Sequence, residues 1–135
     1  MLNRDEIKIL IIEDEIFLSE MLKKFFLIEG YQVFLAKNGE EGLKKIKEIN
    51  PTLMLLDILL PKISGYQVLK TLRKDSEFSQ FSSIPIIVIS NSGQAVEIKK
   101  IKELGVSDYL LKVNLTAKEI VDKVNNFLKN NYLNF

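Results

Sequence analysis

The chain alternates five short apolar runs with amphipathic segments, and this alternation constrains its fold more than any other feature. The runs are IKILII (7–12), YQVFLA (31–36), TLMLLD (52–57), IPIIVIS (84–90) and SDYLLK (107–112). Three of them are continuously apolar, a pattern typical of strands that are covered on both faces. Strands that alternate with helices predict an α/β fold, with a parallel sheet between two layers of helices.

The segments between these runs have the spacing and the end signals of helices. Three of them begin with a pair that resembles a capping box: Asn38 with Glu41, Ser64 with Gln67, and Thr116 with Glu119. The first helix is expected to stop at Gly30 and the fourth at Gly105. The polar stretch 74–83 (KDSEFSQFSS) predicts the end of a helix followed by a surface loop.

Composition limits the chemistry that is available to the chain. Its 135 residues are 47% hydrophobic and fit a single domain, 1–135, with a core of about 7–130. Cysteine and histidine are absent, which excludes disulfides, thiolate chemistry and the commonest general base. The net charge of +1 gives no reason to expect direct binding of nucleic acid or of a membrane. No signal peptide or membrane span is apparent, so we expect a cytoplasmic location.

Polar residues stand where the predicted strands end. Glu13 and Asp14 follow the first strand, Asp57 ends the third, Ser90 ends the fourth and Lys112 ends the fifth. Ligands of open α/β sheets bind beyond the carboxyl ends of the strands, where the strand order reverses. We therefore expect three carboxylates, a hydroxyl and an ammonium to gather at one edge of the sheet.

The expected cluster suits phosphoryl transfer. Like-charged carboxylates raise each other's pKa unless a cation lies among them. Lys112 supplies one positive charge, and a hard divalent cation such as Mg²⁺, which prefers oxygen ligands and binds alongside phosphate, would supply the rest. Asp57 could accept a phosphoryl group as an aspartyl phosphate, and the Ser90 hydroxyl could donate to it. Positioning and charge neutralisation matter more in this chemistry than acid–base groups, so histidine is not required.

Each of these residues also has an ordinary structural explanation. An acidic pair after a strand is often part of a solvated loop, and Asp57 could cap the turn before Pro61. Ser90 by itself is weakly informative, and a lysine at the end of a strand usually faces solvent. The conjunction favours a site, because the polar residues fall at the carboxyl ends of four different strands.

These motifs resemble the receiver domain of the response regulators in two-component signalling, of the stand-alone, chemotaxis-regulator-like type. The resemblance covers roughly 8–128. DILLPKISG (57–65) resembles the phosphoacceptor segment and IIEDE (11–15) the acidic metal-binding pair. IIVIS (86–90) resembles the fourth strand, and ELGVSDYLLK (103–112) resembles the segment with the aromatic switch residue and the lysine. The resemblance implies a flavodoxin-like, doubly wound (βα)5 fold with strand order 2-1-3-4-5.

The resemblance also implies a role for each matching residue of the site. Asp57 would be the phosphorylated aspartate, and Lys112 would contact the phosphoryl group. Asp14 would bind Mg²⁺ (or Mn²⁺) directly, together with Asp57. Glu13 would act mainly through a metal-bound water, and the backbone carbonyl of Leu59 would complete the set of protein ligands.

Switching and partners follow from the same resemblance. Ser90 would move toward the phosphoryl group, and Tyr109 would change between outward and inward rotamers. A histidine kinase or a phosphotransfer protein would donate the phosphoryl group. The face of the fourth helix, fifth strand and fifth helix (about 96–128) would then bind a downstream protein or a second copy of the chain. The protein would be no enzyme beyond catalysing its own phosphorylation and dephosphorylation.

Three positions depart from the family pattern. Val113 stands where the family usually has a proline with a cis bond, so we expect a trans bond and a differently shaped loop, because a cis bond without proline costs about 3–4 kcal/mol. Asn91 is larger than the usual small residue after the serine. Leu59 is apolar. Both are expected to alter access to the phosphoryl group.

Two other function classes are compatible with parts of the pattern. One is a protein-interaction module that keeps the fold without being phosphorylated, which would be marked by a lost acid, hydroxyl or lysine. The other is a Mg²⁺-dependent phosphohydrolase with an aspartyl nucleophile. Such enzymes usually need a second acid two residues after the nucleophile, where this chain has Leu59.

Overall fold

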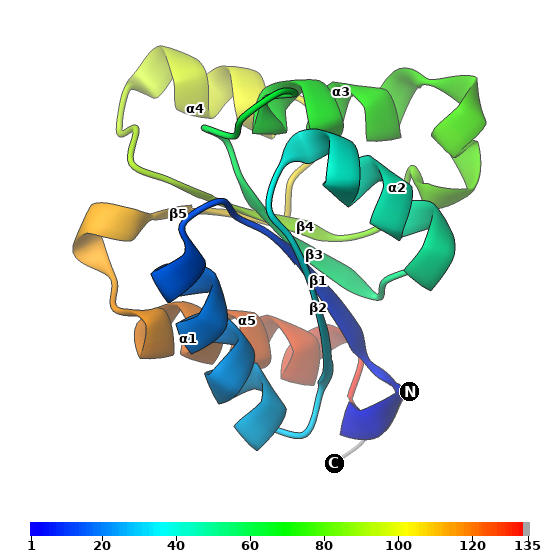
Figure 1. Cartoon of the computed structure of the whole chain (residues 1–135), viewed down its shortest axis with the longest axis vertical. Helices are drawn as coiled ribbons and strands as arrows, with labels where there is room; N and C mark the ends of the chain where they lie inside the picture. Colours follow the sequence, from blue (N-terminus) through cyan, green and yellow to red (C-terminus); the bar gives the residue numbers. More distant parts are fainter. Residues whose placement is uncertain (134–135) are drawn as a thin grey trace.

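The five apolar runs form five parallel strands of one sheet in the computed structural model, which describes residues 1–133 (Figure 1). The strand order is β2-β1-β3-β4-β5, so the doubly wound, flavodoxin-like prediction is confirmed. The strands are β1 (Lys8–Ile12), β2 (Gln32–Ala36), β3 (Leu53–Asp57), β4 (Ile86–Ser90) and β5 (Asp108–Leu111). The α-helices are α1 (Ile16–Ile28), α2 (Gly39–Ile49), α3 (Gly65–Lys74), α4 (Ala95–Lys102) and α5 (Ala117–Asn131).

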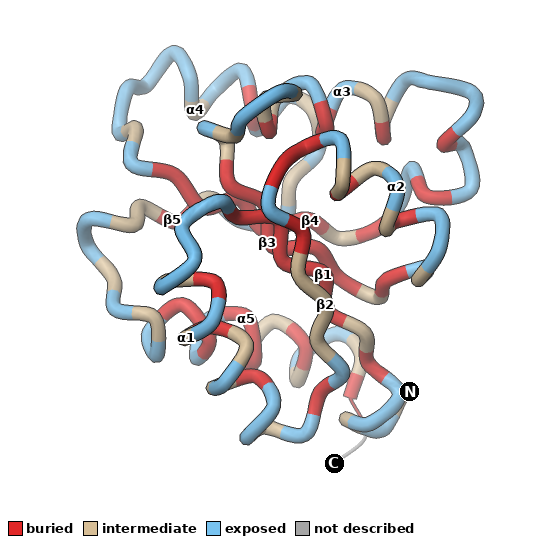
Figure 2. Tube along the Cα trace, viewed as in Figure 1, coloured by how far each residue is buried: buried red, intermediate tan, exposed pale blue. Residues whose placement is uncertain are grey.

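Helices cover both faces of the sheet. Helices α1 and α5 pack on one face, and α2, α3 and α4 pack on the other (Figure 1). Successive residues of β1 alternate between these layers, since Ile9 and Ile11 face α1 and α5, whereas Leu10 and Ile12 face α2 and α3. The buried residues of Figure 2 therefore concentrate along the central strands. This two-sided burial explains why the runs of β1, β3 and β4 are continuously apolar.

The helix ends follow local signals in the sequence. The hydroxyls of Ser64 and Thr116 accept hydrogen bonds from backbone N–H groups in the first turns of α3 and α5, and these two of the three predicted capping boxes are complete. The third is half formed, because the Asn38 side chain accepts from the Glu41 N–H at the start of α2 without the reciprocal bond. Gly30 and Gly105 have positive φ angles of 96° and 78° just beyond α1 and α4, which favours glycine at these positions.

The prediction of a surface loop over 74–83 is wrong in part. Helix α3 does end at Lys74, but Ser76–Phe81 form a 3₁₀ helix rather than a loop. Phe78 and Phe81, three residues apart, are buried in the core layer of α2, α3 and α4. Their burial outweighs the polar composition of the segment, because each aromatic ring removes a large apolar area from water.

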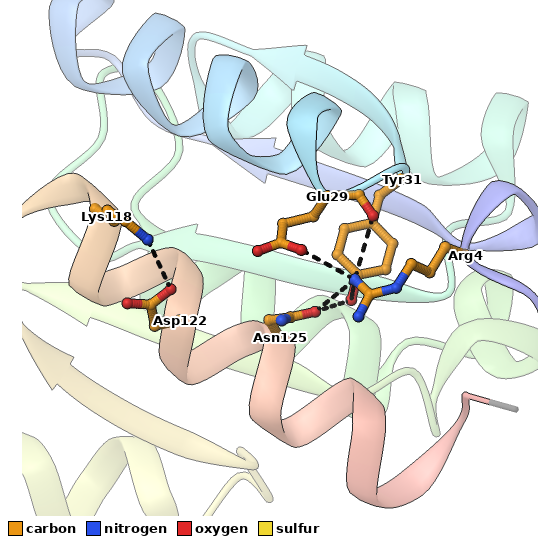
Figure 3. A network of polar contacts seen from close by, with 6 residues as sticks. All are labelled: Arg4, Glu29, Tyr31, Lys118, Asp122 and Asn125. Atoms are coloured by element: carbon orange, nitrogen blue, oxygen red, sulfur yellow. Dashed lines mark hydrogen bonds and ion pairs between the residues drawn. The ribbon is translucent and has the colours of Figure 1, made fainter. Parts of the chain in front are cut away.

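A polar network closes the end of the sheet that lies opposite the predicted site (Figure 3). The Arg4 guanidinium donates to the carboxylate of Glu29 at 3.2 Å, to the hydroxyl of Tyr31 at 3.1 Å and to the side-chain oxygen of Asn125 at 3.0 Å. The Tyr31 hydroxyl also donates to Asn125. These contacts tie the chain before β1, the end of α1, the start of β2 and the middle of α5 together.

Within residues 1–133, every helix is too short or too polar to cross a membrane.

Gly65 lets α3 begin directly against the end of β3. A Cβ atom added there would lie 2.1 Å from the carbonyl oxygen of Asp57 and 2.6 Å from the Cα of Ile58. Both atoms belong to the backbone and cannot rotate away. The Gly65 N–H donates to the Ile58 carbonyl at 2.8 Å, which fixes this close approach. The glycine therefore determines the path of the loop that carries Asp57 and Leu59.

We expect Gly65→Ala to lower the free energy of unfolding by about 2 kcal/mol, because the methyl group must displace backbone in a packed layer. Urea unfolding monitored by circular dichroism measures this effect. Gly93→Ala is the control, since the added Cβ would lie no closer than 3.8 Å to Leu111 and should change stability by less than about 0.5 kcal/mol. Equal effects of the two substitutions would contradict the steric argument.

Candidate functional site

The strand register places Glu13 and Asp57 side by side. Ile12 at the end of β1 pairs with Leu56 of β3, so Glu13 and Asp57 are the next residues on neighbouring strands. Strand β3 in turn pairs Asp57 with Ile89 of β4, one residue before Ser90. The carboxyl ends of β1, β3 and β4 thus meet at the edge of the sheet at which sequence predicted a site.

The Lys112 ammonium binds both buried carboxylates. Its Nζ lies 2.6 Å from Oε1 of Glu13 and 3.1 Å from Oδ2 of Asp57. The Lys112 side chain is 10% exposed, and the Glu13 and Asp57 side chains are 0% and 4% exposed. Ion pairs so deeply buried interact far more strongly than pairs on the surface. One ammonium therefore neutralises one of two carboxylates in a poorly solvated place.

The hydrogen bonding of the Glu13 carboxylate is incomplete, whereas both carboxylate oxygens of Asp57 accept hydrogen bonds, from the Leu59 N–H and the Lys112 ammonium. Oε1 of Glu13 is buried and makes no hydrogen bond of good geometry within the described chain, although the Lys112 ammonium is close. Oε2 of Glu13 accepts from the backbone N–H of Glu15 at 3.0 Å. Buried polar atoms are usually satisfied. The Oε1 atom of Glu13 thus has the Lys112 ammonium as a close ionic partner but no well-aligned hydrogen bond, so a metal ion could still bind this carboxylate.

The pKa values reflect this shortage of positive charge. Burial raises the pKa of Glu13 to about 7, and the adjacent Lys112 ammonium only partly opposes the shift. Burial also raises the pKa of Asp57, again against the influence of Lys112. Burial lowers the pKa of Lys112, but the neighbouring Glu13 and Asp57 outweigh that effect and raise it. The carboxylates thus strengthen the charge on the ammonium, while burial favours the neutral form of each carboxyl group.

The acidic cluster fits a hard divalent cation. Carboxylate oxygens of Glu13, Asp14 and Asp57 all lie within 4.8 Å of one another. Asp14 is exposed to solvent, whereas the other two acids are buried. Mg²⁺ binds carboxylate oxygens and keeps several waters, so an exposed third acid suits it. The three acids predicted to hold the metal are therefore brought together, and their carboxylate oxygens fit the ion.

The two predicted switch residues are connected through Ser92. The hydroxyl oxygen of Ser90 accepts from the backbone N–H of Ser92 at 3.1 Å. The hydroxyl of Tyr109 donates to the backbone carbonyl of Ser92 at 2.9 Å. Ser90 is buried and Tyr109 is half-buried, and the movement of either side chain stays a prediction.

The three departures from the family pattern surround the site. The N–H of Leu59 donates to Oδ1 of Asp57 at 3.3 Å, while the Leu59 side chain is 68% exposed. The proposed use of the Leu59 carbonyl as a metal ligand stays a prediction. Asn91 is exposed. Residues 1–133 contain no cis peptide bond, which confirms the expected trans bond before Val113, and Lys112–Asn114 form a short 3₁₀ helix.

Two residues of the site, Glu15 and Ser92, have contacts that the sequence motifs did not predict. The Glu15 carboxylate lies 3.6 Å from the Lys112 ammonium and adds a third acid to its surroundings. Its place directly after Asp14 in IIEDE was a usable signal. Ser92, which joins Ser90 to Tyr109, gave no signal, because its part depends on the path of the loop between β4 and α4.

Comparison with known families agrees with this geometry. The family described as the response regulator receiver domain matches residues 9–125. The chain belongs to this family. Receiver domains work in two-component signalling with histidine kinases or phosphotransfer proteins, and they typically bind Mg²⁺ at an acidic site. The resemblance of the motifs to a receiver domain is thereby confirmed.

Curated relatives share the receiver region. The "Probable transcriptional regulator ycf27" of Pyropia yezoensis is 34% identical over 122 residues, which cover 90% of this chain and 47% of that relative. The "Response regulator RR06" of Streptococcus pneumoniae serotype 2 is 36% identical over 104 residues, which cover 77% of this chain and 45% of that relative. The chain thus spans about half the length of the curated relatives that it matches.

Solved structures share the fold. The receiver domain of the Francisella response regulator 1452 superposes with a TM-score of 0.79 at 27% identity, over 91% of this chain and 97% of that one. The chemotaxis protein CheY4 of Vibrio cholerae, at 22% identity, shows the same fold with a TM-score of 0.78, over 89% of this chain and 97% of that one.

We predict that Mg²⁺ stabilises the protein more as the pH rises. Between the ordinary value of 4.5 and about 7, folded protein keeps a proton on Glu13 that the unfolded chain releases. The stability that Glu13 contributes is therefore complete below pH 4.5 and lost as the pH rises toward 7, a difference on the order of 3 kcal/mol. Mg²⁺ competes with this proton and restores the loss.

Urea unfolding near pH 5 and near pH 8, with and without MgCl₂, measures this coupling. Glu13→Gln should flatten the pH dependence in the absence of metal and reduce the gain from Mg²⁺. Glu20→Gln, which alters an exposed acid of α1, should leave both unchanged. A wild-type Mg²⁺ effect that is equal at the two pH values would refute the coupling.

Removal of the Lys112 ammonium should destabilise the metal-free protein. Lys112→Met leaves two buried carboxylates without their cation, and breaking such a pair costs about 3 kcal/mol. Denaturant unfolding at neutral pH tests this. Lys118→Met is the matched control, because Lys118 pairs with Asp122 on the exposed surface of α5 and should contribute less than about 0.5 kcal/mol. Similar losses from both substitutions would contradict the special place of Lys112.

Proposed function

We propose that the protein is a phosphorylation-controlled switch in which Asp57 accepts a phosphoryl group. The observation that carries this proposal is the Asp57 carboxylate between the Lys112 ammonium and the acids Glu13 and Asp14, at the carboxyl edge of a parallel sheet. A purely structural carboxylate would need one cationic partner and no further acids. The surplus of negative charge is the property of a site that binds a divalent cation together with a phosphoryl group.

The residues of the chain have distinct tasks in the proposed step. A carboxylate oxygen of Asp57 attacks the phosphorus of a phosphohistidine, and the phosphorus–nitrogen bond breaks as the new phosphorus–oxygen bond forms. The histidine nitrogen leaves and takes a proton from solvent. Lys112 neutralises charge on the phosphoryl oxygens, and the Ser90 hydroxyl donates to one of them. Mg²⁺, when bound by Glu13 and Asp14 with Asp57, supplies further charge neutralisation.

The surroundings of the site favour a protein as the phosphodonor. Four large apolar side chains next to the polar residues are strongly exposed: Ile16 and Phe17 at the start of α1, Leu59 after Asp57, and Val113 after Lys112. Exposed apolar groups that are rimmed by charge are typical of surfaces that bind other proteins. We infer that a histidine kinase or a phosphotransfer protein docks here and presents its histidine to Asp57.

The output is proposed to be a change in binding rather than a second reaction. Tyr109 of β5 touches the Ser92 carbonyl, so a movement of Ser90 reaches the surface of α4, β5 and α5. We propose that this surface binds a downstream protein or a second copy of the chain, without direct contact to nucleic acid. Catalysis is confined to the protein's own phosphorylation and dephosphorylation, and the proposed location is the cytoplasm.

We expect Asp57→Asn to abolish labelling by radioactive acetyl phosphate in the presence of Mg²⁺, because the amide cannot form the acyl phosphate. Acid-resistant, base-labile counts in the isolated protein measure the product. The control is Asp122→Asn, which alters an exposed acid of α5 and should label like the wild type.

Undiminished labelling of the Asp57→Asn variant would refute the assignment. Beryllofluoride separates the proposal from an interaction module that is never phosphorylated. The wild type should bind beryllofluoride only with Mg²⁺ and change its hydrodynamic size or partner affinity, whereas a module without a working site should not respond at all.

A further inference from the structure

Helices α3 and α4 lie next to each other on the face of the sheet away from α1 and α5 (Figure 1). A small cavity lies between them. Its volume is about 140 Å³, and it opens to the surface between the two helices. The residues that line it are Ile58, Tyr66, Glu97, Lys100, Ile101 and Tyr109. Two aliphatic and two aromatic side chains thus form an apolar floor with a charged rim.

Two lysines stand over one aromatic ring at this rim. The Lys100 ammonium lies 4.2 Å from the centroid of the Tyr66 ring, and the Lys70 ammonium lies 5.8 Å from it. Both lysines are exposed, and neither makes an ion pair with any described residue. Tyr66 also borders a shallower groove of about 450 Å³ along α3 that Lys70 lines. The two ammonium groups therefore stand on either side of the ring that the two hollows share, and neither forms an ion pair with a described acid.

The charge of the two helices is strongly one-sided. Within their bounds α3 and α4 carry six basic residues and a single acid, Glu97, whereas the whole chain has a net charge of +1. The Glu97 carboxylate accepts a hydrogen bond from the Ser92 hydroxyl and is thus engaged with its own loop. Of these basic residues, Lys70 and Lys100 stand at the Tyr66 ring, and their positive charge attracts negatively charged partners.

We propose that the depression between α3 and α4, the α3–α4 groove, binds an acidic segment of a partner protein. One large apolar side chain of that segment enters the cavity, and flanking carboxylates meet Lys70 and Lys100. The groove is separate from the phosphoacceptor edge, and its binding does not require Asp57 to be phosphorylated.

The dimensions favour a peptide over other anions. An apolar cavity of about 150 Å³ holds a benzene ring, so 140 Å³ fits one phenylalanine or leucine side chain. Pockets for drug-sized ligands are about 300–1,000 Å³, which is larger. A nucleic-acid backbone would use the lysines but would leave the apolar floor of Ile58 and Ile101 empty. The combination of apolar floor and basic rim matches an acidic peptide with one apolar anchor.

The groove also shares a wall with the switch residues. Tyr109 lines the cavity while its hydroxyl donates to the Ser92 carbonyl, and the Ser92 N–H donates to Ser90. A change at Ser90 can therefore alter the shape of the cavity. This coupling, unlike binding itself, rests on the proposed function.

Titration of ¹⁵N-labelled protein with a short probe peptide tests the proposal. The probe has one phenylalanine between two pairs of glutamates, and two control probes replace the phenylalanine by alanine or the glutamates by lysines. We expect shifts confined to amides of Tyr66, Lys100, Ile101 and their neighbours, and at least a tenfold weaker affinity for each control probe. Equal affinity for all three probes, or absence of binding, would overturn the proposal.

Variants of the protein sharpen the result. Lys70→Met with Lys100→Met keeps most of the apolar stems and should weaken the probe at least tenfold without changing the melting temperature by more than a few degrees. Lys24→Met with Lys44→Met removes the same charge from exposed positions on α1 and α2 and should have little effect. If both double substitutions weakened binding of the probe equally, the attraction would be unspecific and the proposed binding site in the groove would be refuted.

Two further measurements separate the alternatives. If a single-stranded oligonucleotide bound more tightly than the probe peptide, the ligand of the groove would be a nucleic acid, and the proposal would be overturned. Asp57→Asn should bind the probe as well as the wild type does. Binding that persists in this variant keeps the groove proposal even if phosphorylation of Asp57 were refuted, and binding lost with it would overturn the independence of the groove.

Discussion

One ammonium group shared by two buried carboxylates determines the electrostatics of the site on which the proposed function depends. Lys112 lies 2.6 Å from Glu13 and 3.1 Å from Asp57, and all three side chains are largely withdrawn from water. A single positive charge cannot neutralise both acids in a poorly solvated place, so burial raises the pKa of each carboxyl. Because two buried acids share one cation, the site is short of positive charge. A metal ion would supply this charge, and a phosphoryl group would add further negative charge.

The arrangement depends on the topology of the sheet. The strand order places β3 between β1 and β4, so the acids of β1 and β3 become neighbours although 44 positions separate their paired residues Ile12 and Leu56. The lysine arrives from β5, the edge strand, and reaches over β4 to the acids. Gly65 then turns the chain sharply after Asp57, because any side chain there would strike the Asp57 carbonyl. The network around Arg4 secures the opposite end of the sheet (Figure 3).

The loop between β4 and α4 connects two surfaces of different chemistry. On one side Ser90 borders the acidic site, and on the other Tyr109 borders the basic α3–α4 groove. Ser92 touches both residues through its backbone and holds Glu97 through its hydroxyl. The loop residues 91–94 are polar or glycine and lie mostly at the surface, whereas the strands β4 and β5 on either side are packed in the sheet. The loop is therefore the segment that joins the two surfaces through hydrogen bonds rather than through core packing.

The amino-acid sequence by itself determined the five strands, the capped helices and the identity of the polar residues at the strand ends, because these follow from local periodicity and local hydrogen bonding. It did not determine the burial of Phe78, since the segment around this residue is polar and only the folded core shows that the ring packs into it. Nor could it give the roles of Glu15 and Ser92, which depend on where the chain ends up in space. The pairing of Lys112 with Glu13 was decided only by tertiary structure, because residues from three strands had to meet before burial could turn ordinary charges into a site.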